Sequence, residues 1–76
     1  MTSGQLRAAR ALLGWTAQQL ADASGVGVAT IRRAELRVGD AGMGVPIVRA
    51  IKAAFDAASV EFTNGGQPGV RMKERQ

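Results

Sequence analysis

The sequence contains no cysteine and no histidine among its 76 residues. These absences exclude a cysteine or histidine nucleophile, an imidazole general base and a histidine-ligated metal ion. They also remove disulfides and zinc sites with cysteine or histidine ligands as sources of stability. We therefore expect a protein that is not an enzyme and that holds no metal and no cofactor. A single core in so short a chain contributes about 3–5 kcal/mol of net stability, so association with a second copy is the obvious further support.

The chain also lacks long apolar runs. No stretch approaches the ~18 apolar residues that a bilayer-spanning helix needs, and the N-terminus lacks the basic-then-apolar order of a signal peptide. Ten Lys and Arg against six Asp and Glu give a formal charge of +4 and a sequence pI of about 11.2. This excess indicates a polyanionic partner, with nucleic acid ahead of an anionic membrane surface. We expect a cytoplasmic protein with no membrane contact.

Helical start signals divide the first 58 residues into short helices. Two capping-box spacings, Thr2 with Gln5 and Thr16 with Gln19, each predict a helix beginning at the next residue. Pro46 suits the first turn of a later helix, where its missing N–H costs no hydrogen bond. In chain order, the predicted helices cover residues 3–13, 17–23, 28–36 and 46–58.

The remaining segments do not have the helical period. Residues 37–45 contain three glycines in nine positions, and we interpret them as either an ordered but unusual loop or a mobile one. Beyond Ser59 the apolar period becomes two on both sides of a turn sequence at 64–68, which fits a β-hairpin or two separate extended segments. We expect Val60 and Phe62 to share one face, and Val70 and Met72 to share another. We expect a mainly α fold: a four-helix domain over residues 1–58, then a C-terminal β extension and basic tail over 59–76. The segment 60–73 offers unpaired strand edges for pairing across a two-fold axis, so we interpret this extension as a candidate dimerisation element. A lone hairpin is marginal in water, so this extension must pack on the helices or on a second chain.

The segment 16–35 has the pattern of two short helices joined by a tight turn. Ala21 must be small because the two helices cross there, and Gly25 permits the sharp reversal. Leu20, Val26 and Ile31 bury the joint and leave the opposite side of the later helix free.

This segment resembles the Cro/repressor-type (XRE-like) helix-turn-helix family, and the resemblance extends over roughly residues 4–58. The preceding RAARALLGW at 7–15 looks like the first helix of that family, and 60–73 resembles an extension found in a subset of small bacterial regulators. The positions that match the family pattern are Gln18, Gln19, Leu20, Ala21, Gly25, Thr30, Ile31 and Glu35.

The resemblance implies that the helix at 28–36 enters the major groove of DNA. Four of its residues would then face the bases or the groove wall: Val28, Ala29, Arg32 and Arg33. Arg33 is the best candidate for bidentate recognition of guanine, and Arg32 would bind either a guanine or a phosphate. Val28 and Ala29 stand where relatives often carry Gln or Ser, so they would contact thymine methyl groups instead.

The resemblance also implies contacts with the phosphate backbone. The free N–H groups at the start of the second helix would bind phosphate. The expected backbone-contacting residues are Arg7, Arg10, Ala17, Gln18, Thr30 and Arg37. Gly27 replaces the expected capping Ser or Thr, and Ala34 replaces a larger apolar residue, so we expect a slightly weakened third helix.

Several positions admit a structural role beside the functional one. Glu35 is interpreted as pairing with a neighbouring arginine or capping the loop, and Trp15 as packing between helices. Arg32 and Arg33 could also form a solvated face. In the tail, Arg71, Lys73 and Arg75 either follow a phosphate backbone or are simply solvated.

The sequence therefore predicts a transcriptional regulator that binds double-stranded DNA at an inverted repeat as a homodimer, associating with the nucleoid when bound. RNA polymerase or an antagonist protein would be its further partners. Two alternatives remain: a protein-interaction module on a helix-turn-helix scaffold, and an architectural DNA-binding protein used in recombination.

Overall fold

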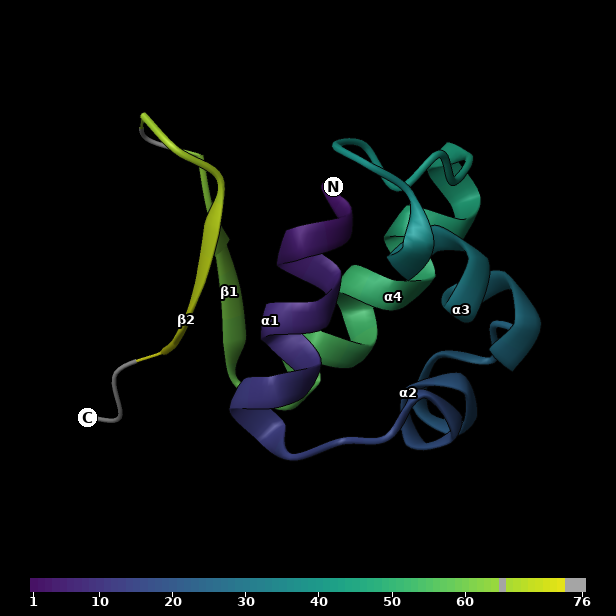
Figure 1. The fold of residues 1–76 in the computed structure, drawn as a ribbon. Coiled ribbons are helices and arrows are strands. Elements are labelled where there is room, and N and C mark those ends of the chain that lie inside the picture. Colours follow the sequence, from purple (N-terminus) through teal and green to yellow (C-terminus); the bar gives the residue numbers. More distant parts are fainter. Residues whose placement is uncertain (65, 74–76) are drawn as a thin grey trace.

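A computed structural model describes residues 1–64 and 66–73 of the chain. Within them, helices α1 (Ser3–Leu13), α2 (Ala17–Ser24), α3 (Val28–Leu36) and α4 (Val45–Ala57) precede strands β1 (Val60–Thr63) and β2 (Gly69–Met72). The mainly α fold with a C-terminal hairpin is confirmed. Figure 1 shows the hairpin on one side of α1 and the α2–α3 pair on the other. Gly65 in the predicted turn and Arg75 in the predicted tail lie outside the described residues.

The helix boundaries follow the local signals. Both capping boxes form, with the threonine hydroxyl accepting from the backbone N–H of the glutamine three residues on and the glutamine oxygen accepting in return. Gly14 and Gly25 end α1 and α2 in the left-handed conformation, at φ 66° and 74°. Gly27 precedes α3 without any side-chain cap, as expected. No helix among the described residues is long and apolar enough to cross a membrane.

The core lies between α1, α4 and the α2–α3 pair, and Phe55 of α4 is fully buried at its centre. Trp15 stacks on Phe55 with ring centroids 5.8 Å apart, and Phe62 of β1 meets the same ring edge-on at 5.8 Å. The expected packing of Trp15 between helices is thus confirmed. Val60 of β1 is 1% exposed, so the hairpin shares the core of the helices.

The segment that connects α3 to α4 is ordered against the start of the chain. The Ser3 N–H donates to the Gly39 carbonyl at 2.8 Å, and the Ala41 N–H donates to the Met1 carbonyl at 3.1 Å. Ala41 is only 2% exposed. Of the two interpretations of residues 37–45, the ordered but unusual loop is therefore the one observed.

The strands β1 and β2 pair antiparallel, with Val60 opposite Met72 and Phe62 opposite Val70. Residues directly opposite each other point to the same side of a sheet. The two apolar pairs expected on separate faces therefore form one apolar face, which packs on α1 and α4. The hairpin is one element, and the alternative of two separate extended segments is excluded.

Candidate nucleic-acid interface

The α2–α3 pair is a rigid unit whose turn is held by backbone and side-chain contacts. The Gly25 N–H donates to the Ala21 carbonyl at 2.9 Å, and the Ser24 hydroxyl accepts from the Val26 N–H at 3.2 Å. Leu20 and Ile31 are fully buried beneath the turn. With its inner side fixed in this way, α3 presents its other side to solvent.

The residues on the exposed side of α3 are spaced three or four positions apart, so they share one face of the helix. Ala29, Arg32 and Arg33 are exposed, whereas Ile31, Ala34 and Glu35 on the inner side are buried. Leu36 continues the outer side, seven residues after Ala29, and is 83% exposed. Three of the four predicted base-contacting residues thus share one exposed side, while Val28 is half-buried and packs against the core.

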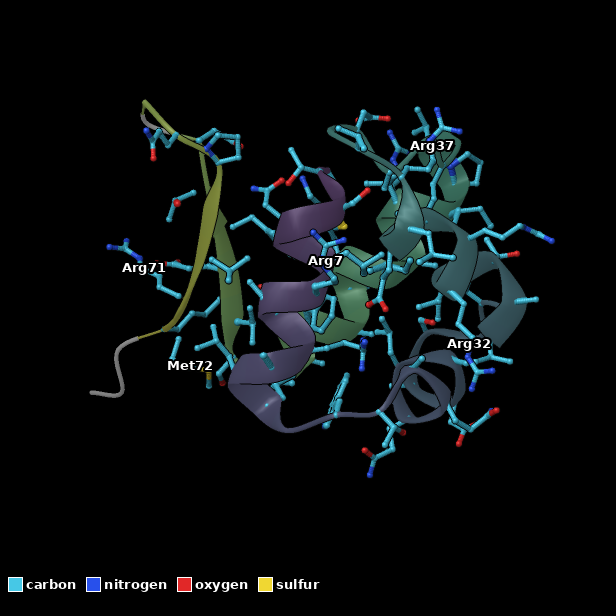
Figure 2. The ribbon with its side chains drawn as sticks, in the orientation of Figure 1. Arg7, Arg32, Arg37, Arg71 and Met72 are labelled. Atoms are coloured by element: carbon cyan, nitrogen blue, oxygen red, sulfur yellow. The ribbon has the colours of Figure 1, made fainter. Side chains whose placement is uncertain are left out.

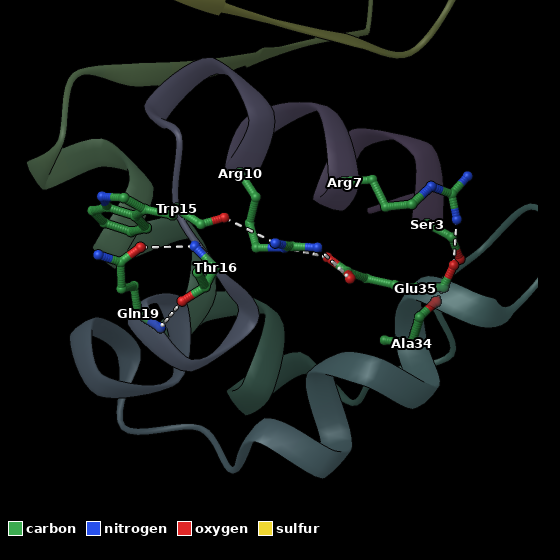
Figure 3. A network of polar contacts seen from close by, with 8 residues as sticks. All are labelled: Ser3, Arg7, Arg10, Trp15, Thr16, Gln19, Ala34 and Glu35. Atoms are coloured by element: carbon green, nitrogen blue, oxygen red, sulfur yellow. Dashed lines mark hydrogen bonds and ion pairs between the residues drawn. The ribbon is translucent and has the colours of Figure 1, made fainter.

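An ion pair between Arg10 and Glu35 sets the position of α3 on α1. The Arg10 Nε and Nη2 donate to the two Glu35 carboxylate oxygens at 2.6 and 2.8 Å, and its Nη1 donates to the Trp15 carbonyl at 2.8 Å. Figure 3 shows this network beside the contact between Arg7 and the Glu35 backbone carbonyl. The hydrogen bond from Arg10 to Glu35 raises the pKa of Arg10 above its ordinary value. The expected structural role of Glu35 is confirmed.

Half of the described basic side chains without a paired carboxylate lie on or just beyond α3. Among the described residues, Arg10, Arg71 and Lys73 form ion pairs with acidic side chains. The basic side chains without such a pair are Arg32, Arg33 and Arg37 at α3 and Arg7, Arg49 and Lys52 elsewhere. Figure 2 shows Arg32 and Arg37 on the α3 side of the molecule and Arg71 projecting at the opposite end. The side of the molecule that carries α3 is therefore the more suitable one for a polyanion.

A comparison with protein families matches the same region. The matching family has the description helix-turn-helix, and the match covers residues 6–39. Residues 6–39 are a helix-turn-helix of the Cro/repressor (XRE) type. No curated protein and no solved structure matches the chain.

The match over residues 6–39 supports a DNA-binding helix-turn-helix regulator. The helix-turn-helix brings three of the residues expected at DNA close together. Thr30, Arg33 and Arg37 line one shallow hollow between α3 and the start of α4. The Arg33 Nη2 lies 3.5 Å from the Thr30 hydroxyl, at the outer limit of a hydrogen bond.

The other expected backbone-contacting residues lie in two places on the helix-turn-helix. Ala17 and Gln18 are at the start of α2, where the first N–H groups have no partner inside the helix. Gln18 is exposed, and its amide donates to Asp22 at 3.0 Å. Arg7 is exposed on α1, but the guanidinium of Arg10 is occupied by Glu35 and Trp15. Arg10 therefore positions α3 on α1, and its guanidinium is not free to bind a phosphate, contrary to the expected backbone contact.

Sequence reasoning missed Leu36 as a member of the outer side of α3. The signal was present, because residues 29, 32, 33 and 36 have the spacing of one helix face. From sequence, an apolar residue at the end of a helix is normally assigned to the core. Only the exposure of Leu36 in the structure shows that it lies on the outer side.

Proposed function

We propose that the protein is a sequence-specific transcriptional regulator that binds an inverted repeat as a homodimer, with α3 in the major groove. The observation that carries the proposal is the set of three arginines at α3, Arg32, Arg33 and Arg37, which have no acidic partner among the described residues. Because an arginine in the major groove can donate two hydrogen bonds to one guanine, this set supports sequence choice as well as affinity.

Base recognition divides between charged and apolar side chains in this proposal. Arg33 binds the O6 and N7 of a guanine, and Arg32 binds a second guanine or a phosphate. Ala29 and Leu36 have no hydrogen-bonding group, so they contact thymine methyl groups. Val28 is half-buried, and the exposed part of its side chain borders the groove.

Phosphate contacts fix the register of α3 on the duplex. The N–H groups of Ala17 and Gln18 and the side chain of Gln18 bind one phosphate at the start of α2. Arg7, Thr30 and Arg37 supply further contacts. Arg10 acts indirectly, through Glu35, by holding α3 against α1.

Two copies are needed because one recognition helix buries little DNA surface. In a two-fold dimer the two α3 helices enter successive major grooves about 34 Å apart, which places the half-site centres ~10–11 bp apart. Occupancy of such a site regulates transcription by blocking or recruiting RNA polymerase.

A duplex titration tests the proposal. The full chain is titrated against a random duplex and against duplexes selected from a random pool, at two salt concentrations. A steep salt dependence and a preference for selected sequences support a regulator. Arg33→Ala should cost about 1–3 kcal/mol on the selected duplex and little on the random one. Equal loss on both would make Arg33 a phosphate contact.

Lys52→Ala is the matched control for this titration. The Lys52 ammonium lies 5.8 Å from the centre of the Phe62 ring, on the hairpin side of α4, so its loss should leave sequence preference unchanged. If the wild-type protein shows neither a salt dependence nor a sequence preference, the interaction-module alternative is supported instead. A salt dependence without sequence preference supports an architectural protein.

A further inference from the structure

The outer edge of β2 carries backbone hydrogen-bonding groups that the hairpin does not use. The Lys73 N–H donates to the Ser59 carbonyl at 2.7 Å, and hydrogen-bonded pairs alternate along an antiparallel ladder. The backbone N–H and C=O groups of the pairs 61 with 71 and 63 with 69 therefore also point toward the partner strand of the hairpin. The N–H and C=O groups of Val70 and Met72 consequently point away from β1.

No described segment covers this edge. The sheet has two strands in the order β1-β2, and the described residues hold no other bridge to the hairpin. An uncovered strand edge is a template for pairing with another chain. The strand β2 packs against α1, and each of these two elements carries a partly exposed apolar side chain. Met72 of β2 is 43% exposed, and Leu12 of α1 is 46% exposed.

The edge is held in a fixed place by the helical domain. Gln5 is only 5% exposed, and its amide nitrogen lies 3.2 Å from the Gly69 carbonyl oxygen and 3.4 Å from the Thr63 carbonyl oxygen. The oxygen of the same amide accepts from the Thr2 N–H in the capping box of α1. The start of α1 and the turn end of the hairpin are therefore tied together, and β2 is presented already in strand conformation.

The other edge of the hairpin is less suitable for pairing. The strand β1 contacts α4, and the Lys52 ammonium of α4 lies 5.8 Å from the centre of the Phe62 ring. By contrast, the cations of β2 and the residue after it are already neutralised: Arg71 pairs with Glu61, and Lys73 pairs with Asp56. Repulsion between two copies of β2 is reduced accordingly.

We infer that β2 pairs antiparallel with β2 of a second copy, with Val70 opposite Met72 of the partner and Arg71 at the two-fold axis, to form one four-stranded sheet. This inference rests on the proposed function, because it identifies the surface that makes the homodimer. The groups of Val70 and Met72 on both copies form four hydrogen bonds. Met72 continues the apolar face across the axis.

The symmetry of this pairing agrees with binding to one duplex. A two-fold axis normal to the sheet keeps the helices of both copies on the same side of it. In each copy α1 packs between the hairpin and α3 (Figure 1). Both α3 helices therefore lie on the side remote from the shared sheet and face the same direction.

The pairing is small, since only Val70, Arg71 and Met72 of each strand pair across the axis. Stable dimers usually bury about 1,600 Å², more than two short strands and two exposed apolar side chains provide. We therefore expect weak association in free solution and stronger association on DNA, where two half-sites raise the effective concentration of the second copy.

Cysteine cross-linking of the full chain tests this interface, because the native sequence contains no cysteine. Arg71 and its symmetry mate form a non-hydrogen-bonded pair with Cα atoms about 4.5 Å apart, inside the range of a disulfide. Arg71→Cys should form a disulfide-linked dimer on mild oxidation, faster with a selected duplex present. Glu61→Cys is the matched control on the same face, three strand spacings or roughly 14 Å from its mate, and should stay monomeric. Equal cross-linking of the two variants, or none with either, overturns the interface.

A second pair of variants tests the backbone hydrogen bonds. Met72→Pro removes an outward N–H without touching the inner ladder, and Met72→Ala keeps that N–H while shortening the side chain. Sedimentation of the duplex-bound protein should show loss of the two-copy complex with Met72→Pro and its partial retention with Met72→Ala, provided that both keep the wild-type circular dichroism. Equal effects would show that edge pairing is not used.

The outcomes separate the interface from the proposed function. Sequence-selective binding by the wild-type chain with no cross-link from Arg71→Cys refutes the interface and leaves DNA recognition intact. A specific cross-link from Arg71→Cys without any DNA binding supports the interface and refutes the regulator.

Discussion

Removal of the charge on Glu35 should destabilise the protein more than any substitution of an exposed charge. Glu35→Gln keeps the shape of the side chain but leaves the guanidinium of Arg10 without a counter-charge. The Glu35 side chain is 10% exposed and that of Arg10 is 22% exposed. The introduced amide would still accept one hydrogen bond from Arg10, so the substitution chiefly tests the charge.

The expected magnitude follows from this burial. Removing one partner of a buried ion pair costs about 3–5 kcal/mol, because the remaining charge is not solvated by water. Since the partial exposure of Arg10 admits some water, we expect the lower end, about 3 kcal/mol. A chain of 76 residues with a single core has about 3–5 kcal/mol of net stability, so Glu35→Gln should remove most of it and lower the unfolding midpoint markedly.

Urea unfolding followed by far-UV circular dichroism measures the effect. A double-mutant cycle with Arg10→Met should give a coupling energy of at least about 1 kcal/mol, because the double variant no longer carries an orphaned charge. Glu61→Gln is the control: its partner Arg71 is 70% exposed, so the loss should stay within about 0.5 kcal/mol. A loss below about 0.5 kcal/mol for Glu35→Gln, or additive effects in the cycle, would refute the positioning role of this pair.

Two further predictions concern α2, α3 and the groove. Gly27→Ser should stabilise the protein by about 0.5–1 kcal/mol, because φ is −60°, the added side chain meets no atom within 4 Å and the hydroxyl caps α3. Gly14→Ser at φ 66° should instead cost about 1–2 kcal/mol; thermal unfolding compares the two, and a loss at both positions would contradict the account of α3. If Leu36 contacts a thymine methyl, replacing thymine by deoxyuridine in a selected duplex should lower the affinity of the wild-type protein for that duplex several-fold. The affinity of the Leu36→Ala variant should not change. Equal weakening of both proteins would assign the methyl contact elsewhere.

The helices could be predicted from sequence because their limits depend on neighbouring residues. Thr16 and Gln19 cap α2 within one turn, and Gly25 ends it through its own backbone conformation. The helix-turn-helix was predictable for the same reason, since the buried residues of its joint are close together in the chain. Local rules also predicted the missing cap at Gly27.

Contacts between distant segments could not be predicted in the same way. Arg10 and Glu35 are 25 positions apart, and their spacing does not show that an arginine on the polar side of α1 is turned inward. The apolar residues of the two strands were assigned to two faces because the register that unites them depends on hairpin closure. Gln5 reaches Gly69 across 64 positions, so the anchoring of the hairpin could only come from the three-dimensional structure.

Selection of bound sequences from a random duplex pool tests the central claim most directly. The full chain should enrich two inverted half-sites centred ~10–11 bp apart, each with at least one guanine. Enrichment of a single half-site or of direct repeats would contradict the two-fold dimer, and no enrichment at all would contradict sequence recognition by α3.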